Sequence, residues 1–533
     1  MNGKGIGAPI DRRHFLQRLS SLLAGGYLLQ NFGSPGDEPG HLVAPALAKG
    51  TGYTLAPWTG DNFTLGHRMR SGDGPSFPKH SEGKVDFIIV GGGMAALTAA
   101  YELRDHNFLL LEQYDDLGGT SLGGSHNGLA YSMGAAYYSD KEGPVAEYAA
   151  HFGLKPAVLG PEKNSFFFEK EWVNGVEGAS ANLLYRNFKR LKTDLAKINK
   201  RFNEEEPLPP VTRPDFLKLD SVNFASMLTA YDPPFRLFVD RILMSSACAD
   251  SERTSALAGT ILANDFFNDS FVLPGGNPAM ARALAAHIGT PGKKNERLKN
   301  GCFVWGVEIK DDGASVVYSD KTGRMHRLDC RHVIVATPPL VTGRILSNVK
   351  NSAKASLFWF RYGSYLVANI ICKKRIFKGT YDNFVAPPFG FTDFTVAETP
   401  YLKNNTYHDP MGSVLTVYNP WQPGTMGRAV LTEGNRPKLA GEIVTALGEL
   451  IPGLDANIER VILTRWGHAI NICQLHFYER ISKINAGFAD SYTLAHSSLQ
   501  GIQCIESAMA AGRLAASRAL KCKATGVKGA KAL

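Results

Sequence analysis

The sequence has few cysteines, and none is spaced as a metal-binding or redox pair. It contains 7 cysteines among 533 residues, and no two of them form a CxxC motif. That absence argues against a zinc site and against thioredoxin-type chemistry, so we predict no metal centre. The odd number and wide spacing also argue against a disulfide framework. We expect these thiols to be small buried apolar groups.

Two kinds of run are missing as well. No uninterrupted apolar stretch approaches the roughly 20 residues that a membrane-spanning helix needs, so we predict no membrane span. The net charge of +9 comes from scattered basic residues rather than from a long Lys/Arg run, which gives no indication of a nucleic-acid partner. Only residues 521–533 are locally basic, and we interpret them as a solvated tail.

Residues 1–48 have the pattern of an export leader. Arg12 and Arg13 are paired, Phe15 and Leu16 follow, and a short apolar run covers residues 19–29. This arrangement resembles a twin-arginine signal peptide, with small residues that offer a cleavage site after residue 48. Because the twin-arginine route exports folded proteins, a bound cofactor would be inserted before export. We therefore predict a periplasmic protein.

The chain is too long for one ordinary core, and its pattern predicts an α/β fold. Residues 85–90 form a continuous apolar run, typical of a parallel strand that is buried on both faces. A glycine turn, a helix and a second short strand at 108–111 complete a βαβ unit. We predict a Rossmann-like domain interleaved with an α+β substrate domain. The expected segments are an irregular arm (49–83), the dinucleotide-binding domain (84–144, 271–344 and 466–520) and the substrate domain (145–270 and 345–465).

A glycine-rich loop directly follows the first strand of that unit. Gly91 permits a tight turn, Gly93 lets the backbone approach a pyrophosphate, and the small Ala96 lets helix and strand pack closely. The start of the helix, with Met94 and Ala95, offers free N–H groups and a partial positive charge to phosphates. These residues are therefore candidate cofactor-binding residues.

An acidic residue stands where such a fold needs one. Glu112 ends the second strand, and Gln113 follows it, so that a carboxylate can accept hydrogen bonds from both ribose hydroxyls. A strand, loop, helix, strand and acid in this order is much stronger evidence than a glycine motif alone. These features predict a bound dinucleotide and leave NAD and FAD open.

Four segments decide between the two cofactors. They read GGGMAALTAAYEL, LEQYDDLGGTS, HVIVATPPL and GFADSYTLAHSSLQGIQCIESAMAAGRLAA, in that order. With these segments, residues 84–520 resemble the flavin-containing amine oxidase superfamily, and the resemblance implies FAD as the cofactor and an FAD-binding Rossmann-like domain. It also implies further cofactor contacts at Gly118, Gly119, Thr120, Val304, Asp490, Ile505 and Ala508.

The chain departs from the oxygen-using members of that superfamily at two positions. Val367 stands where those members carry a lysine, and Cys504 stands where they carry an aromatic residue. The resemblance therefore implies a dehydrogenase that passes electrons to a quinone or a cytochrome. The leader, the GAAYY stretch at 134–138 and the YLVAN strand at 365–369 make the chain most similar to exported bacterial spermidine-dehydrogenase-like proteins.

Oxidation of a C–N bond needs side chains that orient the carbon, exclude water and keep the amine uncharged, because the flavin N5 accepts the hydride. The candidate substrate-facing residues are Tyr137, Tyr138, Trp466, His468 and Cys504. A cationic polyamine would need carboxylates, for which Asp393 and Glu398 are candidates. Two alternatives share the fingerprints: a desaturase or isomerase of an apolar polyene-like substrate, and a flavin-binding protein without catalysis. We expect oxidation of an amine or polyamine.

Overall fold

The computed structural model describes residues 46–47, 52–179, 182–201, 211–288, 297–485 and 492–525. All of them belong to one compact unit, Pro45–Leu533. The predicted leader lies outside the described residues except for Ala46 and Leu47, and Asp490 and most of the basic tail also lie outside them. Within the described part, no helix is both long and apolar enough to cross a membrane.

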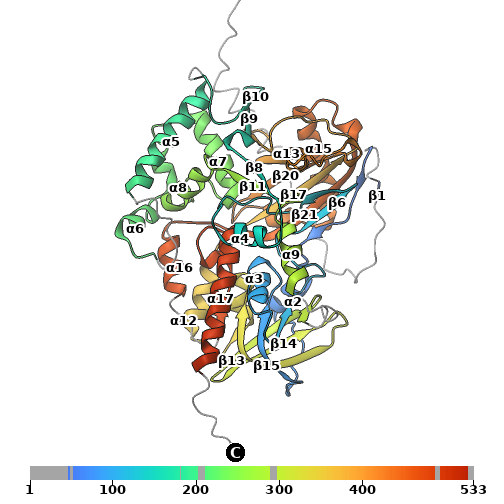
Figure 1. Ribbon diagram of the computed structural model, residues 1–533, viewed down its shortest axis with the longest axis vertical. Coiled ribbons are helices and arrows are strands. Elements are labelled where there is room, and N and C mark those ends of the chain that lie inside the picture. The colour runs from blue at the N-terminus through green and yellow to red at the C-terminus, as the bar shows by residue number, and fades with distance from the viewer. Residues whose placement is uncertain are drawn as a thin grey trace, which may run out of the picture. The chain divides into compact units, whose positions relative to one another are not determined.

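An eight-stranded sheet carries the predicted βαβ unit (Figure 1). Its order is β12-β5-β4-β15-β14-β13-β16, and β22 also pairs with β15. The central strand β4 runs parallel to β5 and β15, and its last four residues are at most 2% exposed, which confirms the predicted buried strand. The strands are β4 (Lys84–Val90), β5 (Phe108–Leu111), β12 (Leu298–Lys299), β13 (Phe303–Lys310), β14 (Gly313–Ser319), β15 (Met325–Val335), β16 (Leu346–Ser347) and β22 (Tyr492–Leu494).

Helices rich in small residues pack against this sheet. Helix α3 (Met94–Glu102) follows β4, and helix α17 (Ile505–Thr525) lies against it. A Cβ on Gly512 would lie 2.4 Å from the carbonyl oxygen of Ala95, so the two helices approach more closely than a side chain at this position would allow. Helices α4 (Pro144–His151) and α9 (Pro278–Ile288) complete this layer.

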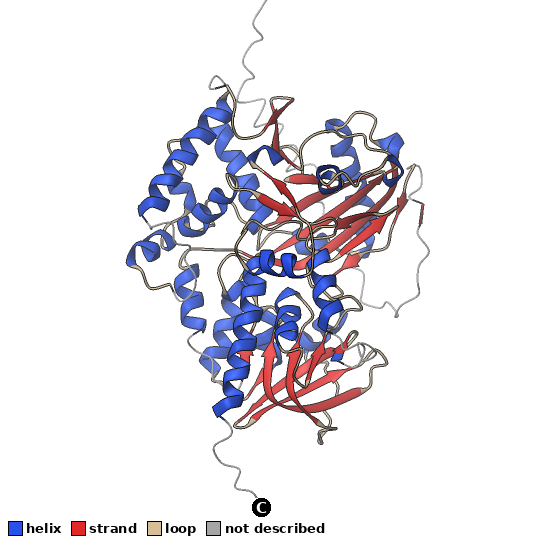
Figure 2. Cartoon of the chain, viewed as in Figure 1, coloured by secondary structure: helices blue, strands red, loops and turns tan. Residues whose placement is uncertain are grey.

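A ten-stranded sheet forms the substrate half, and Figure 2 shows both sheets in red. Its order is β1-β2-β21-β17-β20-β19-β18-β9-β10, and β3 also pairs with β21. The predicted boundary at residue 466 falls inside β21, because an alternating apolar pattern does not reveal which sheet a strand joins. The strands are β1 (Ala46–Leu47), β2 (Thr54–Leu55), β3 (Thr59–Gly60), β9 (Asn164–Phe168), β10 (Glu171–Asn174), β17 (Tyr362–Cys372), β18 (Asp382–Val385), β19 (Asp393–Val396), β20 (Ser413–Trp421) and β21 (Ile458–Asn471).

The two faces of this sheet have different neighbours. Helix α15 (Arg436–Leu450) packs its apolar side on one face. The other face presents a separate cluster that includes Tyr365, Val367, Tyr418 and Trp466. The sheet therefore offers an aromatic surface to the rest of the molecule.

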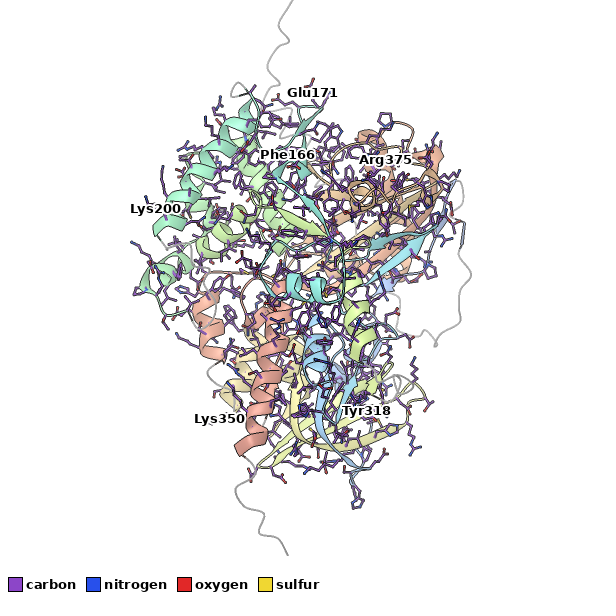
Figure 3. All side chains as sticks on the ribbon, viewed as in Figure 1. Phe166, Glu171, Lys200, Tyr318, Lys350 and Arg375 are labelled. Carbon is purple, nitrogen blue, oxygen red and sulfur yellow. The ribbon has the colours of Figure 1, made fainter. Side chains whose placement is uncertain are left out.

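A helical layer flanks the substrate sheet. It comprises α5 (Leu183–Arg201), α7 (Pro233–Ala247) and α8 (Ala256–Asp265). Helices α6 (Pro214–Asp220) and α16 (Phe477–Asn485) contact each other and pack on the core of the eight-stranded sheet. Aromatic rings from α5 and α7 surround Phe166 of β9, whose position Figure 3 labels. The sequence pattern predicts a mostly helical segment at residues 145–260. Helices are present there, but this segment also contributes β9 and β10, whose pairing is a tertiary contact that local pattern does not encode.

The arm at 49–83 is more ordered than we predicted. Its strands β2 and β3 pair in parallel with β21, and its residues Thr64–Ser71 form helix α2. The two-residue strands are too short for any sequence periodicity. Backbone pairing with a distant strand therefore orders the arm, which explains why its sequence alone suggests an irregular segment.

Candidate active site

One large cavity of about 1920 Å³ lies between the two sheets. Its lining includes the glycine turns after β4 and β5, the aromatic face of the substrate sheet, and the arm. Pockets for a single small ligand usually have about 300–1,000 Å³. The volume therefore suits a large cofactor together with a substrate.

The two glycine turns form one cradle. Gly91 has φ +109°, and a Cβ there would lie 2.8 Å from the carbonyl oxygen of Ala336. Gly93 caps helix α3 without any side-chain hydrogen bond, which leaves the first N–H groups of the helix available to a phosphate. The N–H of Gly118 donates to the carbonyl oxygen of Gly92 at 2.8 Å, so the second turn lies directly on the first.

The predicted contacts around this cradle divide into two groups. Met94, Ala95 and Thr120 line the cavity, as do Gly91, Gly93, Gly118 and Gly119. Ala96 is completely buried and does not line the cavity. Its small side chain packs within the core around α3, which agrees with the packing role that the glycine motif gives this position.

Glu112 lies beside the cradle, since a Cβ on Gly92 would be 2.8 Å from its Oε2. It is 6% exposed, and its Oε1 accepts a hydrogen bond from the N–H of Tyr114 at 2.9 Å. Burial raises the pKa of Glu112 to about 7. Gln113 lines the cavity next to it, and Val304 lines the cavity from β13.

The start of α17 closes the cavity on another side. Cys504, Ile505 and Ala508 all line it. The hydroxyl oxygen of Ser507 accepts a hydrogen bond from the N–H of Cys504 at 3.0 Å, and Gln503 donates to the carbonyl oxygen of Ala469 at 2.8 Å. Cys504 is exposed to the cavity, and enclosure by the surrounding protein raises the pKa of its thiol.

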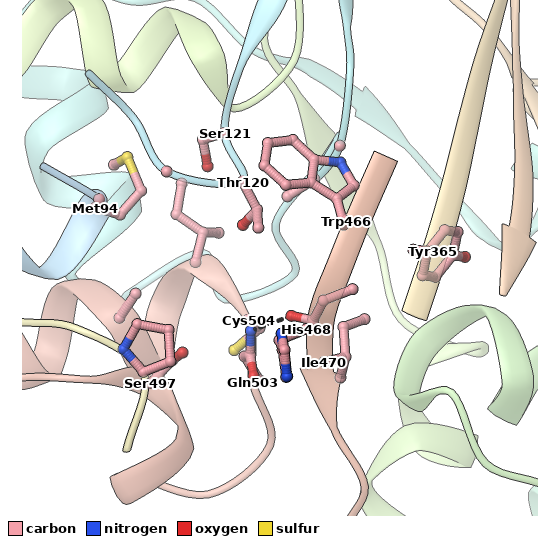
Figure 4. Close-up of a pocket in the computed structure, with 18 of the residues that line it drawn as sticks. Met94, Thr120, Ser121, Tyr365, Trp466, His468, Ile470, Ser497, Gln503 and Cys504 are labelled. Atoms are coloured by element: carbon pink, nitrogen blue, oxygen red, sulfur yellow. Dashed lines mark hydrogen bonds between the residues drawn. The ribbon is translucent and has the colours of Figure 1, made fainter. Parts of the chain in front are cut away.

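Strand β21 brings two candidate catalytic residues to the cavity. Trp466 and His468 alternate along the strand and so face the same side, with Cys504 and Gln503 beside them (Figure 4). The indole N–H of Trp466 donates to the carbonyl oxygen of Met133 at 3.0 Å, which fixes its ring. Burial is the main cause that lowers the pKa of His468 to about 4, so its imidazole is neutral at pH 7.

The strand beside β21 carries Val367 toward the same cavity. The Val367 side chain is buried. Because valine has no ionisable group, this position offers no amine or other group that could carry a proton. Lys373, just beyond β17, donates instead to the carbonyl oxygen of Ala456, and it does not line the cavity. The chemistry of this wall is therefore apolar and aromatic.

Carboxylates gather at a third part of the cavity. Asp265, Asp382 and Asp393 all line it, and we call this group the acidic end. Asp382 and Asp393 are 4% and 2% exposed, respectively, and Oδ1 of Asp382 has no hydrogen-bond partner. Burial raises the pKa of both carboxyls, and the nearby charge of Asp393 raises that of Asp382 further. Glu398 lies elsewhere, because its carboxylate accepts a hydrogen bond from Ser413 at 2.7 Å.

The two predicted tyrosines differ in their surroundings. Tyr137 lines the cavity near the acidic end, with its ring 6.3 Å from that of Tyr381. Tyr138 is 2% exposed and stacks on Phe271 at 5.2 Å, which suits a packing role. Tyr137 therefore remains a candidate substrate-facing residue.

A family model described as flavin containing amine oxidoreductase matches residues 94–471, more than half of the chain. The chain belongs to the flavin-containing amine oxidoreductases. Among curated proteins, the oxidoreductase PigB of Serratia sp. is 22% identical over 366 residues. That match covers 57% of this chain and 54% of PigB, so the chain spans about half the length of this relative.

Solved structures of the family share the fold. A putrescine oxidase variant superposes with a TM-score of 0.64 at 17% identity, covering 82% of this chain and 99% of the other. Cyclohexylamine oxidase from Brevibacterium oxydans gives 0.63 at 17% identity with the same coverage. These likenesses confirm the predicted Rossmann-like domain with its substrate domain.

FAD is therefore the cofactor of this amine oxidoreductase, and the protein is an FAD-dependent oxidoreductase. The cradle fits it: free N–H groups of α3 suit a pyrophosphate, and Glu112 suits ribose hydroxyls. When bound, FAD accepts a hydride equivalent from the substrate and passes two electrons on to an acceptor. Asp490, another predicted contact, lies outside the described residues.

Sequence reasoning missed two members of the acidic end. Asp265 ends helix α8 and Asp382 begins β18, so neither is part of a motif. The fold alone brings them together with Asp393. Across the part of the chain that the structure describes, no group of three His, Cys, Asp or Glu residues is arranged to hold a metal ion.

Proposed function

We propose that this protein is an exported FAD-dependent dehydrogenase that oxidises a C–N bond of a diamine or polyamine and delivers electrons to an acceptor other than oxygen. The acidic end is the observation that carries this proposal. It provides buried carboxylates inside the cofactor cavity, one of them with an unpartnered oxygen. Such groups are costly to bury unless a cation or hydrogen-bond donor meets them.

A substrate with two amines suits the geometry. One protonated nitrogen would lie at the acidic end, and the reacting carbon would lie near Trp466 and His468. The names of putrescine oxidase and cyclohexylamine oxidase, which share the fold, also favour amines. An apolar polyene-like substrate is less suited, because it would offer no partner to the free Oδ1 of Asp382, although Thr392 would still donate to Asp393.

The side chains can keep the reacting amine neutral without a dedicated base. As the C–H bond breaks and the C=N bond forms, the proton on nitrogen leaves to solvent. His468 is neutral at pH 7, and burial keeps the phenols of Tyr365 and Tyr418 protonated. Strand β17 carries Val367 where oxygen-using relatives have a lysine, so this strand brings no cation to the wall. The replacement of that lysine supports a dehydrogenase.

Anaerobic mixing of the purified holoprotein with single amines tests the proposal. We expect a diamine or triamine such as spermidine to bleach the flavin absorbance band, and a monoamine of similar size to do so much more slowly. Admission of air should restore the band slowly compared with an added quinone. Bleaching by a polyene but by no amine would establish the desaturase alternative instead.

A further inference from the structure

A second charged group lines the cavity, and the proposed amine oxidation uses only one of its members, His468. Its members come from α2, α11 (Pro339–Ile345), α14 (Gly427–Val430) and β21. All of them are exposed to the cavity. We call this group the basic mouth, and its members are His67, Arg70, Arg344, Arg428 and His468.

The members of the basic mouth lie within electrostatic range of one another. Four of them act on the fifth: the pKa of His468 is lowered further by Arg428, His67, Arg344 and Arg70. Arg70 also lowers the pKa of His67 and of Arg428. The positive charge at pH 7 therefore comes mainly from the three guanidinium groups.

No carboxylate among the described residues forms a direct ion pair with these arginines, although Asp61 lies within electrostatic range of Arg428. Among the described residues, none of the five forms an ion pair within 4.0 Å. Arg428 donates instead to the carbonyl oxygens of Gly467 at 2.6 Å and Tyr362 at 3.3 Å. The nearby Asp61 already accepts hydrogen bonds from the N–H of Gly467 at 2.7 Å and the hydroxyl of Tyr114 at 3.2 Å.

The cavity thus has two ends of opposite charge. The acidic end attracts a cationic amine, whereas the basic mouth repels it. The phosphates of the cofactor have their own site, since the cradle consists of the glycine turns and the start of α3. Neither the substrate nor the cofactor accounts for the basic mouth.

We propose that the basic mouth binds the electron acceptor, and that this acceptor is a small organic anion with carboxylate, sulfonate or phosphate groups. The proposal rests on the proposed function, because a dehydrogenase without an oxygen-activating lysine needs a second substrate. A cleft lined by one sign of charge concentrates ligands of the other sign and raises their rate of association. Each oxidised C–N bond releases two electrons, so a two-electron acceptor is reduced once and a one-electron acceptor twice.

Binding of hexacyanocobaltate(III), a redox-inert trianion, tests the site directly. We expect calorimetric titration of the holoprotein to show binding that weakens as salt is added. Arg344→Gln and Arg70→Gln should each raise the dissociation constant about fivefold to tenfold. The matched control is Arg68→Gln: this side chain lies on the same helix but over the ring of Trp305 at 5.8 Å, away from the cavity. The Arg68→Gln variant should bind hexacyanocobaltate as tightly as the wild type does.

Competition identifies the ligand that the site serves. With ferricyanide as acceptor, two equivalents are reduced per amine, and hexacyanocobaltate should inhibit competitively against ferricyanide but not against the amine. Competition against the amine would overturn the proposal, as would equal binding by the wild type and both cavity variants. Loss of flavin from the arginine variants would also overturn it, because the basic mouth would then hold the cofactor. Failure of the proposed function appears separately, as absence of anaerobic bleaching by any amine.

Discussion

At the scale of single residues, Asp393 is the group on which the proposed choice of a diamine or polyamine should depend most. It is buried beside the cavity, and Thr392 donates a hydrogen bond to its Oδ1 at 2.6 Å. Replacing it with asparagine keeps the shape and removes the charge that meets the distal ammonium group. We expect kcat/KM for a diamine to fall by about thirtyfold or more, corresponding to about 2 kcal/mol.

The matched measurements use a monoamine and a surface carboxylate. A monoamine lacks the distal charge, so Asp393→Asn should alter its kcat/KM by less than about threefold. Asp409→Asn, at an exposed position, should leave both substrates unaffected. An equal loss for diamine and monoamine would show that Asp393 stabilises the cavity rather than recognising the second amine.

Glu112 gives a prediction about pH. Burial raises its pKa to about 7, so the carboxyl is partly protonated at neutral pH before FAD binds. Ribose hydroxyls donate to the ionised form, and binding of FAD therefore strengthens as pH rises toward and through 7. Below pH 7, each unit should weaken binding by up to about tenfold. Fluorescence titration of the apoprotein with FAD between pH 5.5 and 8.5 measures this.

A variant that cannot ionise provides the control. Glu112→Gln should bind FAD more weakly than the wild type at pH 8, with a dissociation constant that no longer changes with pH. A wild-type constant that stays flat over the same range would assign the ribose contact to another group.

These residues also show what the sequence can predict. Gly91, Gly93 and Glu112 belong to a local motif whose spacing has a physical reason, and all three line the cavity. Asp265 and Asp382 carry no such signal, because they are distant in sequence and meet only through the fold. Glu398 is a candidate because it lies in the predicted substrate domain, yet its carboxylate accepts a hydrogen bond from the hydroxyl of Ser413.

At the scale of elements, the contact between α3 and α17 decides whether the cradle can form. A Cβ on Gly512 would lie 2.4 Å from the carbonyl oxygen of Ala95, at the start of α3. We expect Gly512→Ala to lower the free energy of unfolding by about 1–3 kcal/mol and to weaken FAD retention, because α3 must shift. Thermal unfolding and the flavin-to-protein absorbance ratio measure the two effects.

Another helical glycine provides the comparison. Gly441 lies in α15 with nothing within 4 Å of its added Cβ. Gly441→Ala should therefore raise the free energy of unfolding by about 0.5–1 kcal/mol and leave flavin content unchanged. If both substitutions stabilised the protein, close packing of α17 on α3 would not be the constraint.

Element types follow from sequence wherever a local pattern is long enough. The apolar run of β4 and the hairpin between β13 and β14 follow from such local patterns. In the hairpin, Lys310 lies opposite Gly313 at the turn. The arm does not follow from a local pattern, because β2 and β3 are ordered by pairing with β21. Strand β21, Ile458–Asn471, spans the predicted boundary at residue 466, because one continuous strand supplies both the sheet and the wall that carries Trp466 and His468.

At the scale of the whole molecule, the fold separates two charges that the sequence scatters. The net charge of +9 alone indicates only anionic partners in general. Folding places Arg70, Arg344 and Arg428 around one part of the cavity, which Arg465 and Asp61 also line, and it places Asp265, Asp382 and Asp393 around another part. Under the two proposals, this arrangement would let one cavity accept a cationic donor and an anionic acceptor, a property that no segment of the chain carries by itself.

The predicted leader links this arrangement to a place in the cell. A noncovalent or covalent flavin has to be inserted before passage through the twin-arginine route, so export and cofactor binding should depend on each other. We expect replacement of both Arg12 and Arg13 by lysine to stop periplasmic accumulation while the cytoplasmic protein keeps its flavin, since the charge is unchanged but the paired guanidinium groups are lost. Cell fractionation with flavin absorbance measures both quantities.

The companion variant Glu112→Ala keeps the leader and loses the ribose contact, and it should be retained in the cytoplasm without flavin. Unchanged periplasmic yield of the double-lysine variant would refute the twin-arginine assignment, whereas export of flavin-free Glu112→Ala would refute only the coupling between loading and export.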